Sequence, residues 1–205
     1  MTIINLATLS RRRTLLKSVT AVLAAAALSA CGPEKLQFKS IDITGADYAN
    51  GFNLTDHNGV TRSLNDFKGK VVVVFFGFTQ CPDVCPTALT ELAEVKRKLG
   101  SQGERLQGIF ITVDPERDTE EVLKAYMANF DPSFLALRPT MAQLPEVAKA
   151  FKIYYKKSEG KTAGSYTMDH SAGSYVFDPA GRVRLYTRYG SGADALASDV
   201  ALLLK

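Results

Sequence analysis

The sequence predicts an α/β sandwich with a central mixed sheet, flanking helices and an N-terminal hairpin extension. The unbroken apolar run at residues 71–76 is suited to a central strand that is covered on both faces, and the mostly apolar residues 108–113 predict a second buried strand. A helical pattern follows each run, as in a crossover between parallel strands. Two strand-like segments near the C-terminus flank turn residues 178–181 and predict an antiparallel hairpin.

The hairpin extension is predicted near the start of the folded region. Residues 52–55 and 60–64 flank Asn58-Gly59, which is a strong hairpin signal. His57 directly precedes this turn, so we expect it to be an ordinary solvated turn residue.

Capping residues and helix breakers give the bounds of the first two helices. The first is predicted to begin at Pro86, where a missing N–H costs nothing, and to end at Gly100. Asp118 and Glu121 have the spacing of a capping box and predict a second helix that runs toward Phe130. The buried stripe of the first helix is predicted to be Leu89, Leu92, Val95 and Leu99.

Short elements follow in the C-terminal third of the chain. A helix is predicted over residues 141–151, with its regular part beginning at Pro145. Residues 152–155 are strand-like, and a Gly- and Lys-rich loop follows at residues 156–165. Residues 166–170 are also strand-like, and we expect them to pair near the end of the central sheet.

The last elements complete the order of a thioredoxin-like α/β sandwich. Residues 174–178 and 182–189 form the predicted hairpin, and Ser191 and Asp194 are expected to cap the final helix. The buried positions of that helix are predicted to be Leu196, Val200 and Leu203. We therefore expect residues 41–205 to form a single domain.

Charge separates the first 30 residues from the rest. The 205-residue chain has 25 basic and 21 acidic residues, a formal charge of +4. The first 30 residues hold four basic residues and no acidic one, so the remaining 21 basic residues balance the 21 acidic ones. A nucleic-acid partner is therefore not expected. The composition, 46% apolar and 22% charged, also excludes a disordered chain or a multi-span membrane protein.

Residues 1–30 have the three parts of an export signal. A cationic patch is followed by an apolar run at residues 19–30 and by small residues before a cleavage site. Residues 12–17 also resemble a twin-arginine export signal. An uncleaved anchor is the alternative, but the run is shorter than the roughly 20 apolar residues that a spanning helix needs.

The end of this segment, residues 28–31, is similar to a bacterial lipobox, in which the cysteine becomes the lipidated N-terminus after cleavage. We expect residues 31–40 to carry lipid on Cys31 and to tether the domain. The protein is then an exported bacterial lipoprotein in the periplasm or on the outer face of the cell membrane.

Cys81 and Cys85 are predicted to lie between the carboxyl end of a central strand and the N-terminus of a helix. Ligands bind at such positions in open α/β sheets, and the helix dipole stabilises thiolates there. A disulfide between the two would close a very short loop, so it has little value as a structural staple. Two other interpretations are a redox dithiol, with one residue more than Cys-x-x-Cys, and a metal site that needs a further ligand.

An imidazole ligand has two candidates, because the chain has two histidines. His170 closes the strand-like residues 166–170, whereas His57 lies at the predicted hairpin turn. His170 is therefore the better candidate. Met168, two positions earlier, is expected to be a core residue rather than a thioether ligand.

Three segments together carry a resemblance to a known family: residues 76–86 (FGFTQCPDVCP), residues 112–119 (TVDPERDT) and Asp169-His170-Ser171. The chain resembles the Sco/SenC family of copper-binding thioredoxin-like proteins, which serve assembly of the Cu-A centre of cytochrome c oxidase. The resemblance covers nearly all of the chain from residue 42 onward. One departure is Phe78, which stands where the family usually has Tyr.

The resemblance implies a copper ion, Cu(I) and/or Cu(II), held by Cys81, Cys85 and His170. Thiolates select soft ions and an imidazole suits both copper oxidation states, although zinc also fits such a ligand set. Asp83 and Asp169 are hard donors and poor Cu(I) ligands. We expect Asp83 to shape the loop or contact a partner, and Asp169 to orient the strand or His170.

Asp114 follows the second central strand and is expected at the same edge of the sheet as the cysteines. Helix initiation explains this segment through Asp118. A supporting role for Asp114 or Arg117 at the site is a further hypothesis.

In function, the resemblance implies a membrane-tethered copper metallochaperone. It would deliver one ion to cytochrome c oxidase subunit II or another copper-receiving protein, with a copper donor and a thiol reductant as further partners. The alternative is an enzyme, a thiol–disulfide reductase or thiol peroxidase that uses Cys81 and Cys85 and keeps copper-site cysteines of a partner reduced. A pure docking module would need none of the three site residues.

The lipid anchor predicts that labelled palmitate marks the wild-type chain and leaves a Cys31→Ser variant unlabelled, because the Cys31 thiol is the attachment point. The measurement is autoradiography of the immunoprecipitated protein. An unlabelled wild-type chain, or a labelled variant, contradicts the anchor.

Overall fold

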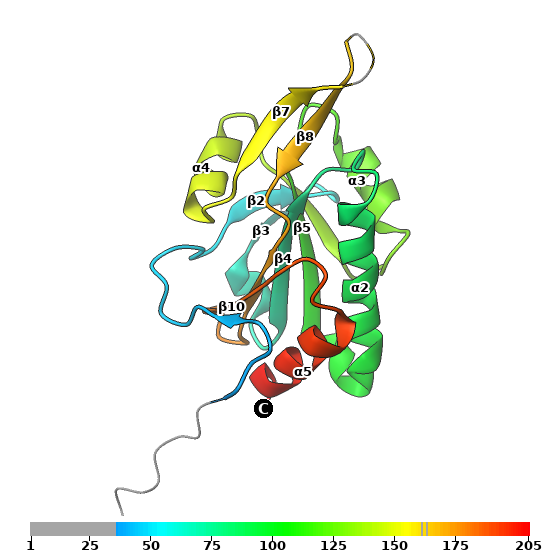
Figure 1. The fold of residues 1–205 in the computed structure, drawn as a ribbon. Helices are drawn as coiled ribbons and strands as arrows, with labels where there is room; N and C mark the ends of the chain where they lie inside the picture. The colour runs from blue at the N-terminus through cyan, green and yellow to red at the C-terminus, as the bar shows by residue number, and fades with distance from the viewer. Residues whose placement is uncertain (1–35, 161, 163) are drawn as a thin grey trace, which may run out of the picture. The chain divides into compact units, whose positions relative to one another are not determined.

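The two apolar runs form the central pair of strands in an eight-stranded mixed sheet (Figure 1). β4 (Val71–Gly77) and β5 (Leu106–Thr112) pair in parallel, and every residue of both strands is buried. Strands that are apolar without alternation are stable only when both of their faces are covered. The predicted centre of the sheet is therefore confirmed.

The other strands extend this pair on both sides in the order β1-β10-β9-β4-β5-β6-β2-β3. β9 is antiparallel to β4 and β6 is parallel to β5, which makes the sheet mixed. The bounds of these strands are β1 Ile41–Asp42, β2 Asn53–Asp56, β3 Thr61–Ser63, β6 Leu135–Arg138, β9 Ser174–Phe177 and β10 Val183–Thr187. Both predicted hairpins, β2–β3 and β9–β10, are confirmed.

Helices cover both faces of the sheet. They are α2 Val84–Lys98, α3 Glu120–Met127, α4 Gln143–Ala150 and α5 Ala193–Leu203, with 3-10 turns at Leu64–Phe67 and Gly100–Arg105. Phe151, directly after α4, packs on Phe76, and Tyr126 of α3 packs on Phe110. Phe110 is paired with Phe75, so these two side chains share one face of the sheet, and Phe76, the next residue, faces the other. Since Tyr126 of α3 packs on Phe110 and Phe151 after α4 packs on Phe76, the two helices lie on opposite faces of the sheet. α2 packs against α5 (Figure 1).

The predicted helix starts are corrected in two places. α2 begins at Val84, two residues before Pro86, so Cys85 belongs to its first turn. Thr119 caps α3 with its side chain, whereas Asp118, the expected cap, is buried. Asp118 fails as a cap because three hydrogen bonds from two threonines hold its carboxylate inward.

The last helix also lacks the predicted cap. Its N-cap is Gly192 at φ 83°, a left-handed conformation that favours glycine over Ser191 or Asp194. Pro145 lies in the first turn of α4, where its missing N–H costs no hydrogen bond. The predicted buried residues of α5 are confirmed, and Asp199 is buried as well. Those of α2 are confirmed except Leu99, which follows the helix half-buried, and Cys85 is buried in addition.

Residues 155–170 differ most from the prediction. β7 (Tyr155–Glu159) occupies part of the expected loop, and β8 (Tyr166–His170) pairs with β7 instead of with the central sheet. Most β7 side chains are exposed, so this strand is not suited to a buried sheet. The two strands form a separate antiparallel pair, here called the ribbon (Figure 1).

The computed structural model describes residues 36–205 except Lys161 and Ala163. The expected export signal and Cys31 lie outside these residues. Phe38–Lys205 forms one compact unit. Within the described part of the chain, no helix is long and apolar enough to cross a membrane.

Candidate metal centre

The two cysteines lie at the junction between the end of β4 and the start of α2. Cys81 is half-buried in the turn after β4, and Cys85 is fully buried in the first turn of the helix. Neither is in a disulfide. The backbone N–H of Cys85, one of the amides that a helix leaves unpaired at its start, points at Sγ of Cys81 over 3.4 Å. The start of α2 therefore favours a thiolate at Cys81.

Gly77, the last residue of β4, makes room for the Cys85 sulfur. A Cβ atom at this position would lie 2.8 Å from Sγ of Cys85 and 2.7 Å from the ring of Phe110. Both distances are shorter than side-chain carbons tolerate, so any residue larger than glycine displaces the thiol or the ring. Sequence reasoning assigned Gly77 no role, although a glycine after six large apolar residues in a central strand was a usable signal.

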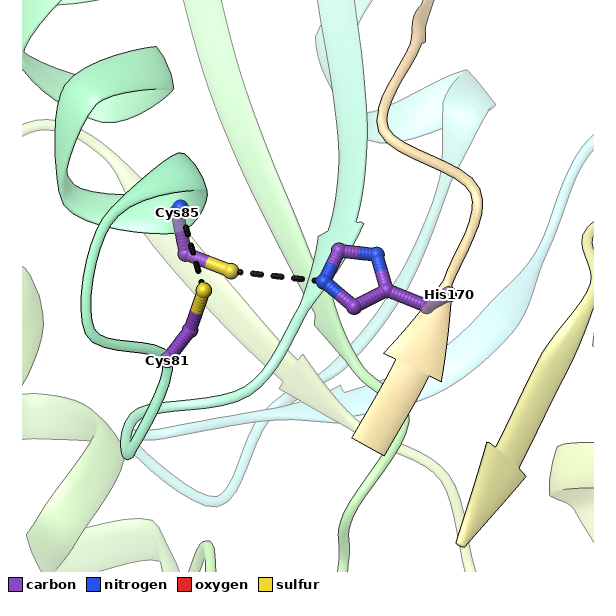
Figure 2. A group of neighbouring side chains, drawn as sticks. All are labelled: Cys81, Cys85 and His170. Atoms are coloured by element: carbon purple, nitrogen blue, oxygen red, sulfur yellow. Dashed lines mark hydrogen bonds between the residues drawn. The ribbon is translucent and has the colours of Figure 1, made fainter. Parts of the chain in front are cut away.

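His170 reaches the cysteines from the end of β8 (Figure 2). Its Nε2 lies 3.5 Å from Sγ of Cys85, and its Nδ1 lies 2.8 Å from the carbonyl oxygen of Ser171. That oxygen only accepts, so Nδ1 donates to it, and Nε2 is the ring nitrogen that faces the thiols. The rings of Phe75 and Phe78 meet the imidazole edge-on, at centroid distances of 6.1 and 5.8 Å.

Both sulfurs and an imidazole nitrogen therefore lie within 4.8 Å of one another (Figure 2). Sulfur and imidazole donors suit Cu(I), Cu(II) and Zn²⁺, whereas Mg²⁺ and Ca²⁺ prefer oxygen donors. The ligand set leaves room for an exogenous fourth donor, because three protein ligands do not close a tetrahedral site. The donor chemistry fits a soft or borderline metal ion.

The two thiols share one proton unequally. A hydrogen bond from Cys85 lowers the pKa of Cys81, and contacts with His170 and with the amides of Asp83 and Cys85 lower it further, against the effect of burial. The same hydrogen bond and burial raise the pKa of Cys85. At neutral pH the metal-free site is therefore Cys81 thiolate beside Cys85 thiol.

Of the predicted supporting aspartates, Asp83 and Asp169 are both exposed. The Thr87 hydroxyl is 3.5 Å from the Asp83 carboxylate, and the Ser158 hydroxyl donates to Asp169 over 2.6 Å. Neither belongs to the donor group. Met168 is buried, as expected for a core residue.

The prediction that His57 is a solvated turn residue is wrong. It is half-buried, its Nδ1 accepts from the amide of Ala136 over 3.1 Å, and its own amide donates to the carbonyl of Ala136 over 2.9 Å. The imidazole thus joins the N-terminal hairpin to β6, a strand that the sequence did not reveal.

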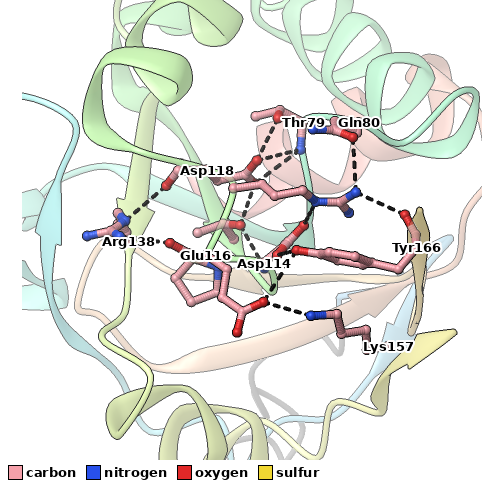
Figure 3. Close-up of polar contacts among 11 residues, drawn as sticks. Thr79, Gln80, Asp114, Glu116, Asp118, Arg138, Lys157 and Tyr166 are labelled. Carbon is pink, nitrogen blue, oxygen red and sulfur yellow. Dashed lines mark hydrogen bonds and ion pairs between the residues drawn. The ribbon is translucent and has the colours of Figure 1, made fainter. Parts of the chain in front are cut away.

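Asp114 lies in a segment of polar contacts beside the cysteines, residues 114–118, here called the acidic loop (Figure 3). Asp114 is buried and accepts from the Tyr166 hydroxyl over 2.8 Å and from Arg117 Nε.

Asp118 accepts from the amide and the hydroxyl of Thr79, at 3.1 and 2.6 Å, two residues before Cys81. Burial raises the pKa of Asp118 even though these hydrogen bonds lower it. Residues that looked like helix initiation thus support the cysteine turn.

A family model described as SCO1/SenC matches residues 42–205. The chain belongs to the SCO1/SenC family. The mitochondrial SCO2 homolog of Bos taurus is 39% identical over 144 residues, 69% of this chain and 53% of that protein. The SCO2-like protein of Rickettsia felis is 37% identical over 132 residues, 64% of each chain. The alignments thus span about half to two thirds of the length of these relatives.

Solved structures of the SCO1/SenC family share the fold. Bradyrhizobium japonicum ScoI with copper bound is 40% identical, with a TM-score of 0.68 over 74% of this chain and 96% of that one. Apo Sco1 of Thermus thermophilus is 36% identical, with a TM-score of 0.72 over 83% of this chain and 99% of that one. The predicted thioredoxin-like sandwich is confirmed by these likenesses.

Gly77→Ala should weaken metal binding by about tenfold or more, because the new methyl group displaces the Cys85 thiol from the other donors. Competition titration of the purified protein with Cu(I) measures the effect.

Gly108→Ala is the matched control. Gly108 lies on β5, and a Cβ there would meet the Phe134 ring at 2.7 Å, so both variants should lose about 1–3 kcal/mol of stability from overpacking. Only Gly77→Ala should lose affinity. Equal metal affinities in the two variants would show that Gly77 does not act through Cys85.

Proposed function

We propose that this chain is a copper metallochaperone of cytochrome c oxidase assembly, which binds one copper ion through Cys81, Cys85 and His170. The observation that carries the proposal is the convergence of two sulfurs and one imidazole nitrogen within 4.8 Å. Membership of the SCO1/SenC family and 40% identity to a ScoI solved with copper bound support copper over zinc.

Binding of a copper ion would release one thiol proton, that of Cys85. The raised pKa of Cys85 keeps its proton in the metal-free protein, and the ion displaces it. Cys81 has a lowered pKa and is already a thiolate at neutral pH, so it releases none. Acid restores the competing proton on Cys85, and affinity therefore falls as the pH falls.

Delivery follows from the same ligand set. Thiols of a recipient protein would replace Cys81, Cys85 and His170 on the ion one at a time and would lose their protons as they bind. One proton would return to Cys85, the rest would pass to water, and the oxidation state of the ion would not change. The recipient we propose is the Cu-A site of cytochrome c oxidase subunit II. A copper donor reloads the carrier, and a thiol reductant keeps the pair reduced because a disulfide offers no thiolate.

The proposed location is the outer face of a bacterial cell membrane. The N-terminal sequence supports it through the cationic patch, the apolar run and the lipobox-like residues 28–31. A lipid on Cys31 would keep the carrier on the membrane surface, close to an integral membrane oxidase.

The alternative function is a thiol–disulfide reductase. The thiolate of Cys81 would attack a disulfide of a partner, and Cys85 would then displace the partner, leaving two partner thiols and a Cys81–Cys85 disulfide. The unequal protonation of the two cysteines favours such chemistry. His170 is not needed as a ligand for it.

Copper titration of the reduced full-length protein should give one ion per chain. Affinity should fall sharply in Cys81→Ala, Cys85→Ala and His170→Ala, and should rise about tenfold per pH unit near neutrality, as expected for one released proton. His57→Ala is the control for histidine loss, because His57 contacts Ala136 and is not in the donor group.

The two functions separate in cells that carry His170→Ala. A copper carrier loses oxidase activity in this strain, whereas a reductase keeps it and fails only when a cysteine is replaced. Unchanged copper binding by purified His170→Ala would overturn the three-ligand site.

A further inference from the structure

His170 ends β8, a strand outside the central sheet, four residues before Ser174 of the central strand β9. β8 pairs with β7 from Tyr155–His170 to Glu159–Tyr166, and neither strand pairs with the eight-stranded sheet. Cys81 and Cys85 follow the central strand β4, and Cys85 lies in the first turn of α2. Because β8 has no backbone pairing with the central sheet, the placement of His170 depends on the side-chain contacts of the ribbon as well as on its short connection to β9.

The acidic loop is a fixed support for such contacts. Arg138 of β6 donates to the carbonyl oxygens of Pro115 and Asp118, over 2.7 and 3.0 Å. The hydroxyl of Thr112, at the end of β5, accepts from the Asp114 amide and donates to the Asp118 carboxylate. Both ends of this short loop are therefore tied to central strands (Figure 3).

Arg117 extends from this support to both halves of the site. Its Nη1 donates to the Gln80 side chain over 3.0 Å, next to Cys81, and to the Tyr166 carbonyl over 2.9 Å. Its Nε donates to Asp114. Its guanidinium carbon lies 3.6 Å from the centroid of the Tyr166 ring and 5.9 Å from that of Phe78.

Tyr166 closes this network. It is the first residue of β8, and its hydroxyl donates to Asp114, the same carboxylate that Arg117 binds. Tyr166 thus meets Arg117 through its ring and its carbonyl oxygen, and meets the loop through its hydroxyl. A planar guanidinium can stack and donate in its own plane at the same time, which a lysine ammonium cannot.

We propose that Arg117 is a positioning residue that locks the ribbon against the cysteine turn and thereby holds His170 in reach of the ion. The proposal rests on the three-ligand copper site. Arg117 contacts neither the thiols nor the imidazole in the structure, so its effect on copper passes through the placement of His170.

The dependence should be stronger for Cu(II) than for Cu(I). Thiolates alone satisfy soft Cu(I), whereas Cu(II) gains more from an imidazole. Loss of Arg117 should therefore alter the Cu(II) complex first.

A double-mutant cycle tests the proposal on the full-length protein. Arg117→Ala should lower Cu(II) affinity by about tenfold and shift the sulfur-to-Cu(II) absorption band toward that of His170→Ala. In the His170→Ala background the same substitution should change neither, because no third ligand remains to be placed. Tyr166→Leu, which removes the stacking ring, should reproduce the effect of Arg117→Ala.

Glu116→Gln is the matched control. It removes the ion pair between Glu116 and Lys157, at 2.8 Å, which also joins the acidic loop to the ribbon. Both partners are about half exposed, so the pair is screened by water and its loss should leave Cu(II) affinity within about twofold. A change as large as that of Arg117→Ala would mean that any contact with the loop suffices.

Two results would overturn the role of Arg117 while leaving the copper site intact. One is wild-type affinity and absorption in Arg117→Ala. The other is an equal loss in the wild-type and His170→Ala backgrounds, which would place the effect on the cysteines or on the fold. Unchanged Cu(II) binding by His170→Ala would instead overturn the three-ligand site and this proposal together.

Discussion

The contact between Nε2 of His170 and Sγ of Cys85, at 3.5 Å, joins two parts of the molecule that share no strand pairing. One part is the buried central sheet and the helix start that follows it, where glycine and tight packing hold the thiols. The other is the ribbon, held on the first part by contacts of Arg117 and Tyr166, by buried Met168 and by the short connection from His170 to β9. The glycine at position 77, which makes room for the Cys85 sulfur, and the contacts of Arg117 and Tyr166, which hold the ribbon, make this contact possible.

The division has a chemical consequence. In the proposed copper site, two thiolates from one turn would bind a soft ion, and an imidazole from a separate strand pair would be the third ligand. A carrier needs both retention and release of its ion, and a third ligand on a separate element would suit both. A redox enzyme has no such need, so the tautomer fixed by the Ser171 carbonyl and the aromatic packing around His170 favour the carrier.

Local pattern predicted the parts of the fold that depend on local physics. The apolar runs of β4 and β5 and the Asn58-Gly59 turn were recognisable because strand burial and turn geometry act over a few residues. β6 was missed because four residues are too few to show a pattern, and its neighbours β5 and β2 are distant in sequence. β8 was assigned to the central sheet and most of β7 to a loop, because the sequence of one strand does not reveal its pairing partner.

The site divides in the same way. The positions of Cys81 and Cys85 follow from the strand–turn–helix order, and His170 stood out because few imidazoles were available. A supporting role for Asp114 or Arg117 was a hypothesis from the sequence, but that of Asp118 was missed, since Asp118 has the spacing of a helix cap yet hydrogen-bonds Thr79 and Thr112. Arg117 and Tyr166 are 49 residues apart, and only the folded chain shows that they stack.

X-ray absorption at the copper edge tests the central claim most directly, because it counts the atoms bound to the ion. The Cu(II)-loaded wild-type protein should show two sulfur scatterers and one imidazole, with the imidazole signal lost in His170→Ala. A spectrum with no imidazole in the wild-type protein, or one unchanged by the substitution, would contradict a copper site built from Cys81, Cys85 and His170.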